Sequence, residues 1–229
     1  RQGLFIKVAQ VVAEEFQIDL DQIKITATNT GKVPNTSATA ASSGADMNGM
    51  AARDAAMTIK NRLITFAAEK YGVAEAAVRF VPGKVIIGDQ AELSFADVIK
   101  QAYLARVSLS ATGYYATPKI HYDRENASGR PFYYFAYGMA CSEVLIDTLT
   151  GENKVTRVDI IHDVGQSLNP AIDRGQIEGG FIQGMGWLTT EELWWDDRGN
   201  LRTHAPSTYK IPACSDRPED FRMEFFFFF

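Results

Sequence analysis

The chain has 229 residues, 46% apolar content and a net charge of −5 at pH 7, which is ordinary for a globular protein with a sizeable core. Without a cluster of Lys and Arg, this negative balance argues against a nucleic-acid-binding surface. No apolar run reaches the roughly 18 residues of a membrane-spanning helix, and two cysteines are too few for a disulfide framework, which favours a reducing, cytoplasmic setting.

The first part of the chain predicts helices around a loop of small residues. In chain order we expect a helix over 2–16, a half-buried strand over 23–28, a small-residue loop over 29–44, a long helix over 46–71, a hairpin over 78–87 and a helix over 94–105. Gly72 ends the long helix. Ser94, with Asp97 three residues later, forms an approximate capping box for the last one.

After residue 105 the pattern becomes rich in β-strand. We expect extended segments over 107–115, 132–149 and 154–164, a helix over 169–189, a second hairpin over 192–202 and an extended segment over 206–212. Asn169 and Pro170 are a typical cap and first residue for the helix. Helices mixed with antiparallel hairpins predict an α+β fold, which we divide into two parts, 1–105 and 106–229.

Two helix starts could hold a ligand. The stretch 39–44 (TAASSG) offers backbone N–H groups and hydroxyls without bulk, directly ahead of the long helix. It lacks the Lys and fixed glycines of a P-loop, and a flexible Ser/Ala loop is the alternative. Gln2-Gly3, at the first helix start, combines free N–H groups with an amide that both donates and accepts. An ordinary helix beginning is the alternative there.

The helix over 170–189 carries a third candidate. Gln176 and Gln183 are seven residues apart and therefore share a face. Four glycines, each costing up to about 1 kcal/mol relative to Ala in a helix interior, suggest close approach of a ligand or another backbone: Gly179, Gly180, Gly184 and Gly186. A crossing with another helix is the alternative.

Other residues give weaker signals. The histidines show no zinc-ligand spacing, and Glu191-Glu192 is typical of a solvated face. Cys141 lies within an apolar strand and is expected to be buried and inert. We assign the aromatic groups to core and hairpin packing: Tyr114-Tyr115, Tyr133-Tyr134-Phe135 and Trp194-Trp195.

Six stretches, in this order, resemble the molybdopterin-binding region of the molybdenum hydroxylase family. They are 2–4, 32–46 (KVPNTSATAASSGAD), 106–118 (RVSLSATGYYATP), 137–151 (YGMACSEVLIDTLTG), 163–186 (DVGQSLNPAIDRGQIEGGFIQGMG) and 204–213 (HAPSTYKIPA). SLSATGYY and ACSEVLID favour the xanthine dehydrogenase branch over aldehyde oxidases and carbon monoxide dehydrogenases. The likeness covers nearly the whole chain, except about 71–92 and the terminal Phe run. We read the chain as a fragment, with apolar surface exposed where neighbouring domains would pack.

The resemblance implies an oxidoreductase that converts hypoxanthine to xanthine and xanthine to urate, with oxygen from water. Its implied cofactors are molybdenum–molybdopterin in this region, and 2Fe-2S clusters, FAD and NAD elsewhere in the parent enzyme. Implied partners are the purine substrate and an Fe-S/FAD subunit or domain, within an oligomeric parent. An aldehyde oxidase-like activity and a cofactorless scaffold module remain open as alternatives.

The resemblance also implies which residues hold the cofactor. They are Gln2, Gly3, Ala40, Ala41, Ser42, Ser43, Gly44 and either Gln176 or Gln183, with Ala41 beside the metal. The family's catalytic Glu lies in a Lys-x-x-Gly-Glu-Pro-Pro-like segment that does not occur in these 229 residues. No catalytic residue is therefore assigned, and the isolated chain is expected to be inactive.

Overall fold

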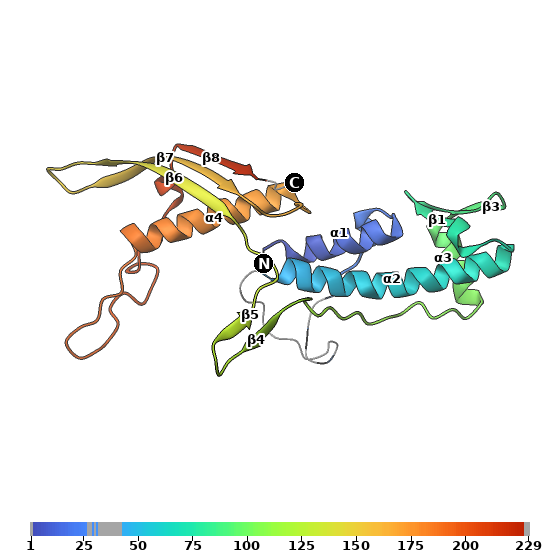
Figure 1. Ribbon diagram of the computed structural model, residues 1–229. Helices are drawn as coiled ribbons and strands as arrows, with labels where there is room; N and C mark the ends of the chain where they lie inside the picture. The colour runs from blue at the N-terminus through green and yellow to red at the C-terminus, as the bar shows by residue number, and fades with distance from the viewer. Residues whose placement is uncertain (1, 27–28, 30, 32–42, 227–229) are drawn as a thin grey trace. The chain divides into compact units, whose positions relative to one another are not determined.

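The computed structural model describes residues 2–26, 29, 31 and 43–226. Contacts divide the chain into two compact units, Arg1–Tyr133 and Tyr134–Phe229. Both combine helices with small, mainly antiparallel sheets (Figure 1), which confirms the predicted α+β class. The predicted division into the parts 1–105 and 106–229 stays a prediction.

The first unit packs three helices around a small sheet. Its elements are α1 (Leu4–Phe16), η1 (Leu20–Gln22), α2 (Gly44–Tyr71), η2 (Glu75–Ala77), β1 (Val78–Val81), β2 (Lys84–Ile87), β3 (Ala91–Ser94), α3 (Phe95–Leu104), β4 (His121–Asp123) and β5 (Ser128–Arg130). The three helices and the hairpin at Pro82-Gly83 confirm the predictions made from the sequence. Strand β3 was not predicted. Ser94 caps α3 by accepting the Asp97 N–H at 3.1 Å. The core is centred on Leu63, Val85, Ile87 and Val98.

Helices α1 and α2 run side by side in the same direction (Figure 1). Gly49 faces Val11, since a Cβ on Gly49 would lie 3.7 Å from the Val11 Cγ2. Farther along both helices, Arg53 Nε contacts Glu15 Oε1 at 2.6 Å. Because residue numbers rise together along the two helices, their N-termini lie at the same end.

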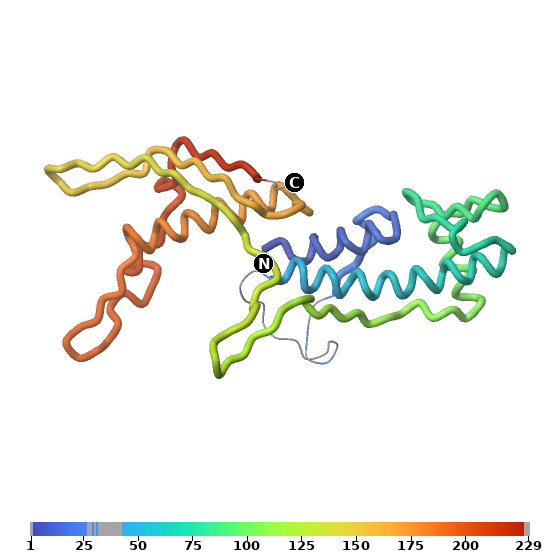
Figure 2. Tube along the Cα trace, viewed as in Figure 1, coloured from blue at the N-terminus to red at the C-terminus, as the bar shows by residue number. Residues whose placement is uncertain are grey.

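Residues 107–117 form an extended segment, as predicted for 107–115, but among the described residues no strand pairs with it. The segment lies along α2 instead, as Figures 1 and 2 show. Its odd-numbered residues are half-buried and its even-numbered ones exposed. The apolar alternation is thus satisfied by a helix surface. The strand predicted over 23–28 is wrong for residues 23–26, and residues 27–28 lie outside the described part.

The second unit covers one face of a three-stranded sheet with a helix. Its elements are β6 (Gly138–Ile146), β7 (Asn153–His162), α4 (Pro170–Thr189), η3 (Cys214–Asp216) and β8 (Asp220–Phe225). The β6–β7 hairpin confirms the extended segments that the sequence predicts here. Strand β8, which pairs parallel to β7, was not predicted. Ile177 and Phe181 of α4 pack on a core of Val158, Ile160 and Met223.

The ends of α4 are fixed differently. At its start, Asn169 Oδ1 accepts the Ile172 N–H at 3.3 Å and Pro170 is the first residue, as predicted. Beyond its end, the predicted hairpin over 192–202 is reduced to a single bridge between Trp195 and Leu201. The segment predicted as extended over 206–212 instead turns at 206–208, where Ala205 O accepts the Tyr209 N–H at 2.7 Å.

Several side chains predicted to be buried lie at the surface. Cys141 is exposed, because β6 is an edge strand and no part of the described chain covers it. Core packing of the aromatic groups is also wrong for the exposed residues Tyr114, Tyr133, Tyr134, Phe135, Trp194 and Trp195, although Trp195 does pair with Leu201 in a hairpin bridge. The exposed apolar surface expected for a fragment is present on both units.

Candidate functional site

Four of the predicted site residues lie at the shared end of the parallel helices. Gln2 and Gly3 adopt left-handed backbone conformations (φ 58° and 66°), and Gly3 is the N-cap of α1. Ser43 is the N-cap of α2, whose first residue, Gly44, is buried. A left-handed Gln followed by Gly turns the chain sharply into the helix. The sequence signals at these two helix starts thus converge on one end of the first unit.

The remaining loop residues cannot be placed in the same way. Ala40, Ala41 and Ser42 lie outside the described residues. Their contact with a cofactor, and the position of Ala41 beside a metal, therefore stay predictions.

The two helix starts bring partial positive charge to the shared end, which Asp46 in the first turn of α2 partly offsets. The first N–H groups of an α-helix have no partner within the helix, and each helix start acts as about half a positive charge. In α1 no acidic residue lies in the first turn, while α2 carries Asp46 there. Two aligned helix starts favour an anionic group placed between them, each by roughly 0.3–1 kcal/mol.

A half-buried ion cluster holds the two helices in this register. Glu15 Oε1 lies 2.6 Å from Arg53 Nε, and Glu15 Oε2 lies 3.5 Å from Lys60 Nζ. Partial burial by itself would raise the pKa of Glu15. The hydrogen bond from Arg53 and the positive charges of Lys60 and Arg53 together outweigh burial and lower that pKa below its ordinary value.

The third candidate segment presents a bare surface on α4. Gln176 and Gln183 are exposed and share a face. Between them, no atom of the residues that the structure describes lies within 4 Å of a Cβ built on Gly179 or Gly180. The opposite face of the helix, with Ile177 and its neighbours, packs on the sheet. The result is a flat glycine surface flanked by two amides.

The glycines of α4 do not all have the same role. Gly186 is buried because Glu191 Oε1 and Pro212 approach it; a Cβ there would lie 2.6 Å from Pro212 Cδ. The glycine at position 186 is therefore explained by the close approach of Glu191 and Pro212 of the same chain, without a ligand. The sequence reasoning also missed Gly175, which is exposed one turn before Gly179; its Cβ position is likewise more than 4 Å from any atom in the described part of the chain. Its i, i+4 spacing to Gly179 was the available signal.

The two groups of candidate residues belong to different units. Gln2, Gly3, Ser43 and Gly44 lie in the first, and the α4 glutamines lie in the second. Their convergence on one ligand stays a prediction, as does the choice between Gln176 and Gln183.

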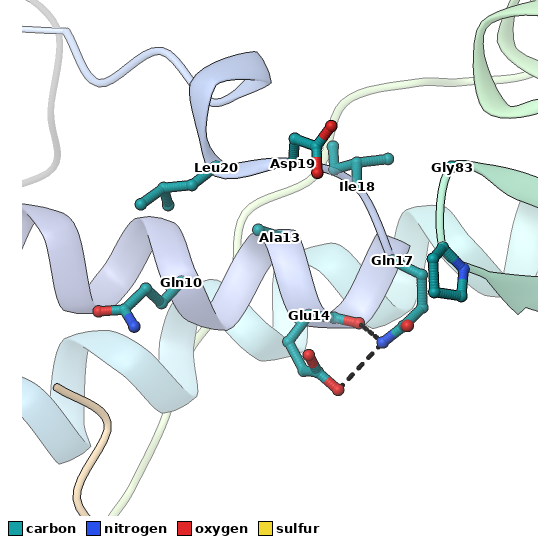
Figure 3. Close-up of a pocket in the computed structure, with 9 residues that line it drawn as sticks. Gln10, Ala13, Glu14, Gln17, Ile18, Asp19, Leu20 and Gly83 are labelled. Carbon is teal, nitrogen blue, oxygen red and sulfur yellow. Dashed lines mark hydrogen bonds between the residues drawn. The ribbon is translucent and has the colours of Figure 1, made fainter.

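A cavity lies elsewhere on the first unit. Its volume is about 530 Å³, and its lining residues are Gln10, Ala13, Glu14, Gln17, Ile18, Asp19, Leu20, Pro82 and Gly83. Figure 3 shows that these residues come from the C-terminal half of α1, from the segment that follows it and from the turn between β1 and β2, with Gln17 bonded to Glu14. The lining includes two carboxylates, those of Glu14 and Asp19, and no cation. It contains none of the predicted site residues and does not suit an anionic cofactor.

Two other kinds of site are absent from the described part of the chain. No group of three or more His, Cys, Asp or Glu side chains is placed to hold a metal ion there. Within the same residues, no helix has the length and apolar character needed to cross a membrane.

Comparison with known proteins places the chain in a family. Residues 2–218 match the molybdopterin cofactor-binding domain. Xanthine dehydrogenase/oxidase of Felis catus is 48% identical over 222 residues, which are 97% of this chain and 15% of that protein. Aldehyde oxidase 2 of Mus musculus is 45% identical over 222 residues, with the same coverage. The chain thus spans about 15% of the length of these relatives.

Solved structures agree with the fold. Quinoline 2-oxidoreductase from Pseudomonas putida 86 superimposes with a TM-score of 0.80 at 27% identity, over 98% of this chain and 28% of that one. The chain therefore belongs to the molybdopterin cofactor-binding domain family of molybdenum hydroxylases.

Proposed function

We propose that this chain forms part of the cofactor-binding wall of an oxidoreductase of the xanthine dehydrogenase type. The observation that carries the proposal is the pair of parallel helix starts, which gathers Gln2-Gly3 and Ser43-Gly44 at one end of the first unit. The 48% identity to a xanthine dehydrogenase/oxidase supports the branch.

The chemistry of these groups fits molybdopterin. Its phosphate is an anion, which suits the backbone N–H groups at the two helix starts. Its pterin ring edge alternates donors and acceptors, which suits the two-ended amides of Gln2 and Gln176 or Gln183. The flat glycine surface around Gly179 admits a planar ring without a side chain in the way.

In this proposal the chain places the cofactor rather than performing the redox chemistry. When bound, the molybdenum cofactor supplies a two-electron centre at which oxygen from water is transferred to substrate. The glutamine amides orient the ring, and the small residues of the loop and of α4 allow close contact. The parent enzyme converts hypoxanthine to xanthine and xanthine to urate, and passes electrons through 2Fe-2S clusters and FAD to NAD. These 229 residues contain no Lys-x-x-Gly-Glu-Pro-Pro segment, so the isolated chain does not turn over.

The molybdenum and pterin content of the full-length parent protein tests this proposal. We expect about one molybdenum per chain in the unmodified protein and a clear loss in Gln2→Ala and in a Gln176→Ala/Gln183→Ala double variant. Gln90→Ala, at an exposed turn, is the matched control and should keep its metal. A parent protein that carries no molybdenum overturns the proposal and favours a cofactorless scaffold.

A second candidate activity is oxidation of aldehydes, which is favoured by the 45% identity to aldehyde oxidase 2. The two activities are separated by kcat/KM of the metal-loaded parent with xanthine and with an aromatic aldehyde. We expect xanthine to be preferred. A preference for the aldehyde would retain the cofactor assignment and replace the substrate.

A further inference from the structure

The extended segment 107–117 is attached to α2 at two places. At one, Arg62 Nη1 donates to the backbone oxygens of Ser108 and Ser110 at 3.2 and 2.8 Å. At the other, Asp54 Oδ2 accepts the Tyr114 N–H at 3.1 Å. Along α2 the contacts run from Arg62 back to Asp54 while the segment runs forward, so the two are antiparallel. These bonds fix the register of the segment on the helix.

The closest approach is at Gly113. A Cβ built on this residue would collide with the backbone oxygen of Ala51 and would lie 2.6 Å from the backbone nitrogen of Ala55. Both obstacles are helix backbone, which cannot swing aside as the tip of a side chain can. A side chain at position 113 therefore has to push the segment away from α2 or push the helix away from the segment.

The contact point lies close to the candidate site. From Ala51 to Gly44, the first residue of α2, is two turns of helix, or about 10 Å at 1.5 Å per residue. Over two hydrogen-bonded turns a helix moves nearly as a rigid body, so displacement at Ala51 is carried to Ser43 and Gly44. Arg53, two residues after Ala51, binds Glu15 of α1, so we expect α1 to move together with this part of α2.

We infer that segment 107–117 positions the ligand-binding end of α2, and that Gly113 is the positioning residue. The inference rests on the proposed function, because it concerns how firmly the same site holds molybdopterin. Cofactor retention then depends on a backbone contact that touches no cofactor. It also depends more on Gly113, near the start of α2, than on Arg62, which lies farther along the helix.

The experiment uses the full-length parent with Gly113→Ala, Arg62→Gln and Thr112→Ala. Thr112 is the exposed neighbour of Gly113 on the same segment and serves as the matched control. For each variant, molybdenum per chain is measured before and after dialysis, together with the Tm and the electron paramagnetic resonance spectrum of reduced, metal-loaded protein. We expect Gly113→Ala to lose molybdenum at least five-fold faster than the unmodified protein, with a shifted spectrum, and Thr112→Ala to match the unmodified protein.

The comparison with Arg62→Gln separates positioning from simple destabilisation. If the segment only stabilises the fold, molybdenum retention will follow Tm across all variants and the spectrum will not shift, which overturns the inference. If Gly113→Ala does not fold, Asp54→Asn takes its place. Its molybdenum retention relative to Tm, and its electron paramagnetic resonance spectrum, then decide in the same way. An unmodified parent without molybdenum refutes the proposed function itself, whereas a loaded parent whose Gly113→Ala variant behaves normally refutes this inference alone.

Discussion

Gly179 lies on an open helix surface, and this position leads to opposite expectations for stability and for binding. No atom of the described residues lies within 4 Å of its Cβ position. In the 229-residue chain, Gly179→Ala should raise the free energy of unfolding by about 0.5–1 kcal/mol, because Ala is the better helix former. In the parent protein the same methyl group stands on the proposed cofactor surface and should lower molybdenum content. Urea unfolding and metal analysis measure the two effects; unchanged metal content would contradict the role given to this surface.

Gly186, on the same helix, should respond in the opposite direction. Its Cβ position is 2.6 Å from Pro212 Cδ and is also crowded by Glu191. We expect Gly186→Ala to lower the free energy of unfolding by about 1–3 kcal/mol, as other overpacked substitutions do. Urea unfolding of this variant beside Gly179→Ala provides the internal control. Equal stability of the two variants would show that the loop around Pro212 does not close on α4.

At this scale the sequence indicated which residue types matter but not their surroundings. The excess of glycine in α4 was visible, yet Pro212, which crowds Gly186, is distant in sequence and approaches it only in the folded chain. Gly113 gave no signal, because a single glycine in an extended segment is unremarkable until a helix backbone lies against it. Cys141 was expected to be buried from its apolar neighbours, and the edge position of β6 leaves it exposed.

The α1–α2 pair should show a defined pH dependence. The pKa of Glu15 is lowered from 4.5 in the folded state, where Arg53 and Lys60 bind the carboxylate. A lowered pKa stabilises the fold above the unfolded value, and this stabilisation is lost as pH falls through the folded value. At pH 7, Glu15→Gln should therefore cost about 1 kcal/mol. That difference from the unmodified chain should shrink toward zero once the pH lies below the folded pKa.

Urea unfolding at a series of pH values between 7 and 3 measures this difference. Glu69→Gln, an exposed position near the C-terminal end of α2, is the control and should show no such trend. A Glu15→Gln penalty that stays constant over the whole range would mean that the ion cluster does not hold the helices together.

Elements with local signals were predictable, and those defined by distant partners were not. α3 and α4 begin at predicted caps, Ser94 and Asn169, and their side chains accept N–H groups as expected. In contrast, β8 pairs parallel to β7 only after α4 and a long loop, and it has no turn signature nearby. The alternation in 107–117 is real, but the partner that satisfies it is α2 rather than a strand.

Across the whole molecule, large apolar side chains remain at the surface of both units. Leu104 is 72% exposed in the first unit, and Leu149 and Leu188 are 94% and 88% exposed in the second. Apolar surface on this scale promotes association. We expect the 229-residue chain to self-associate as its concentration rises through the micromolar range, with sedimentation velocity as the measurement. A chain that stays monomeric throughout this range would show that the exposed apolar surface does not drive self-association.

Family membership was the whole-molecule property that sequence predicted best, because six stretches carry it in a fixed order and residues 2–218 match the family. The two helix starts on the first unit were predictable as well, since helix starts have local signatures; their role in holding a cofactor stays a prediction. Gln2 and Gln183 belong to different units, and neither segment carries a local pattern that predicts how far apart they lie.

The most direct test of the central claim is therefore a structure of the full-length parent with its cofactor bound, at a resolution that shows side chains. The account predicts that the Gln2 amide, the start of α2 at Gly44, and either Gln176 or Gln183 all lie within hydrogen-bond distance of one molybdopterin molecule. Gln2 and the α4 glutamines on separate surfaces, with the cofactor in contact with only one of them or with neither, would contradict it.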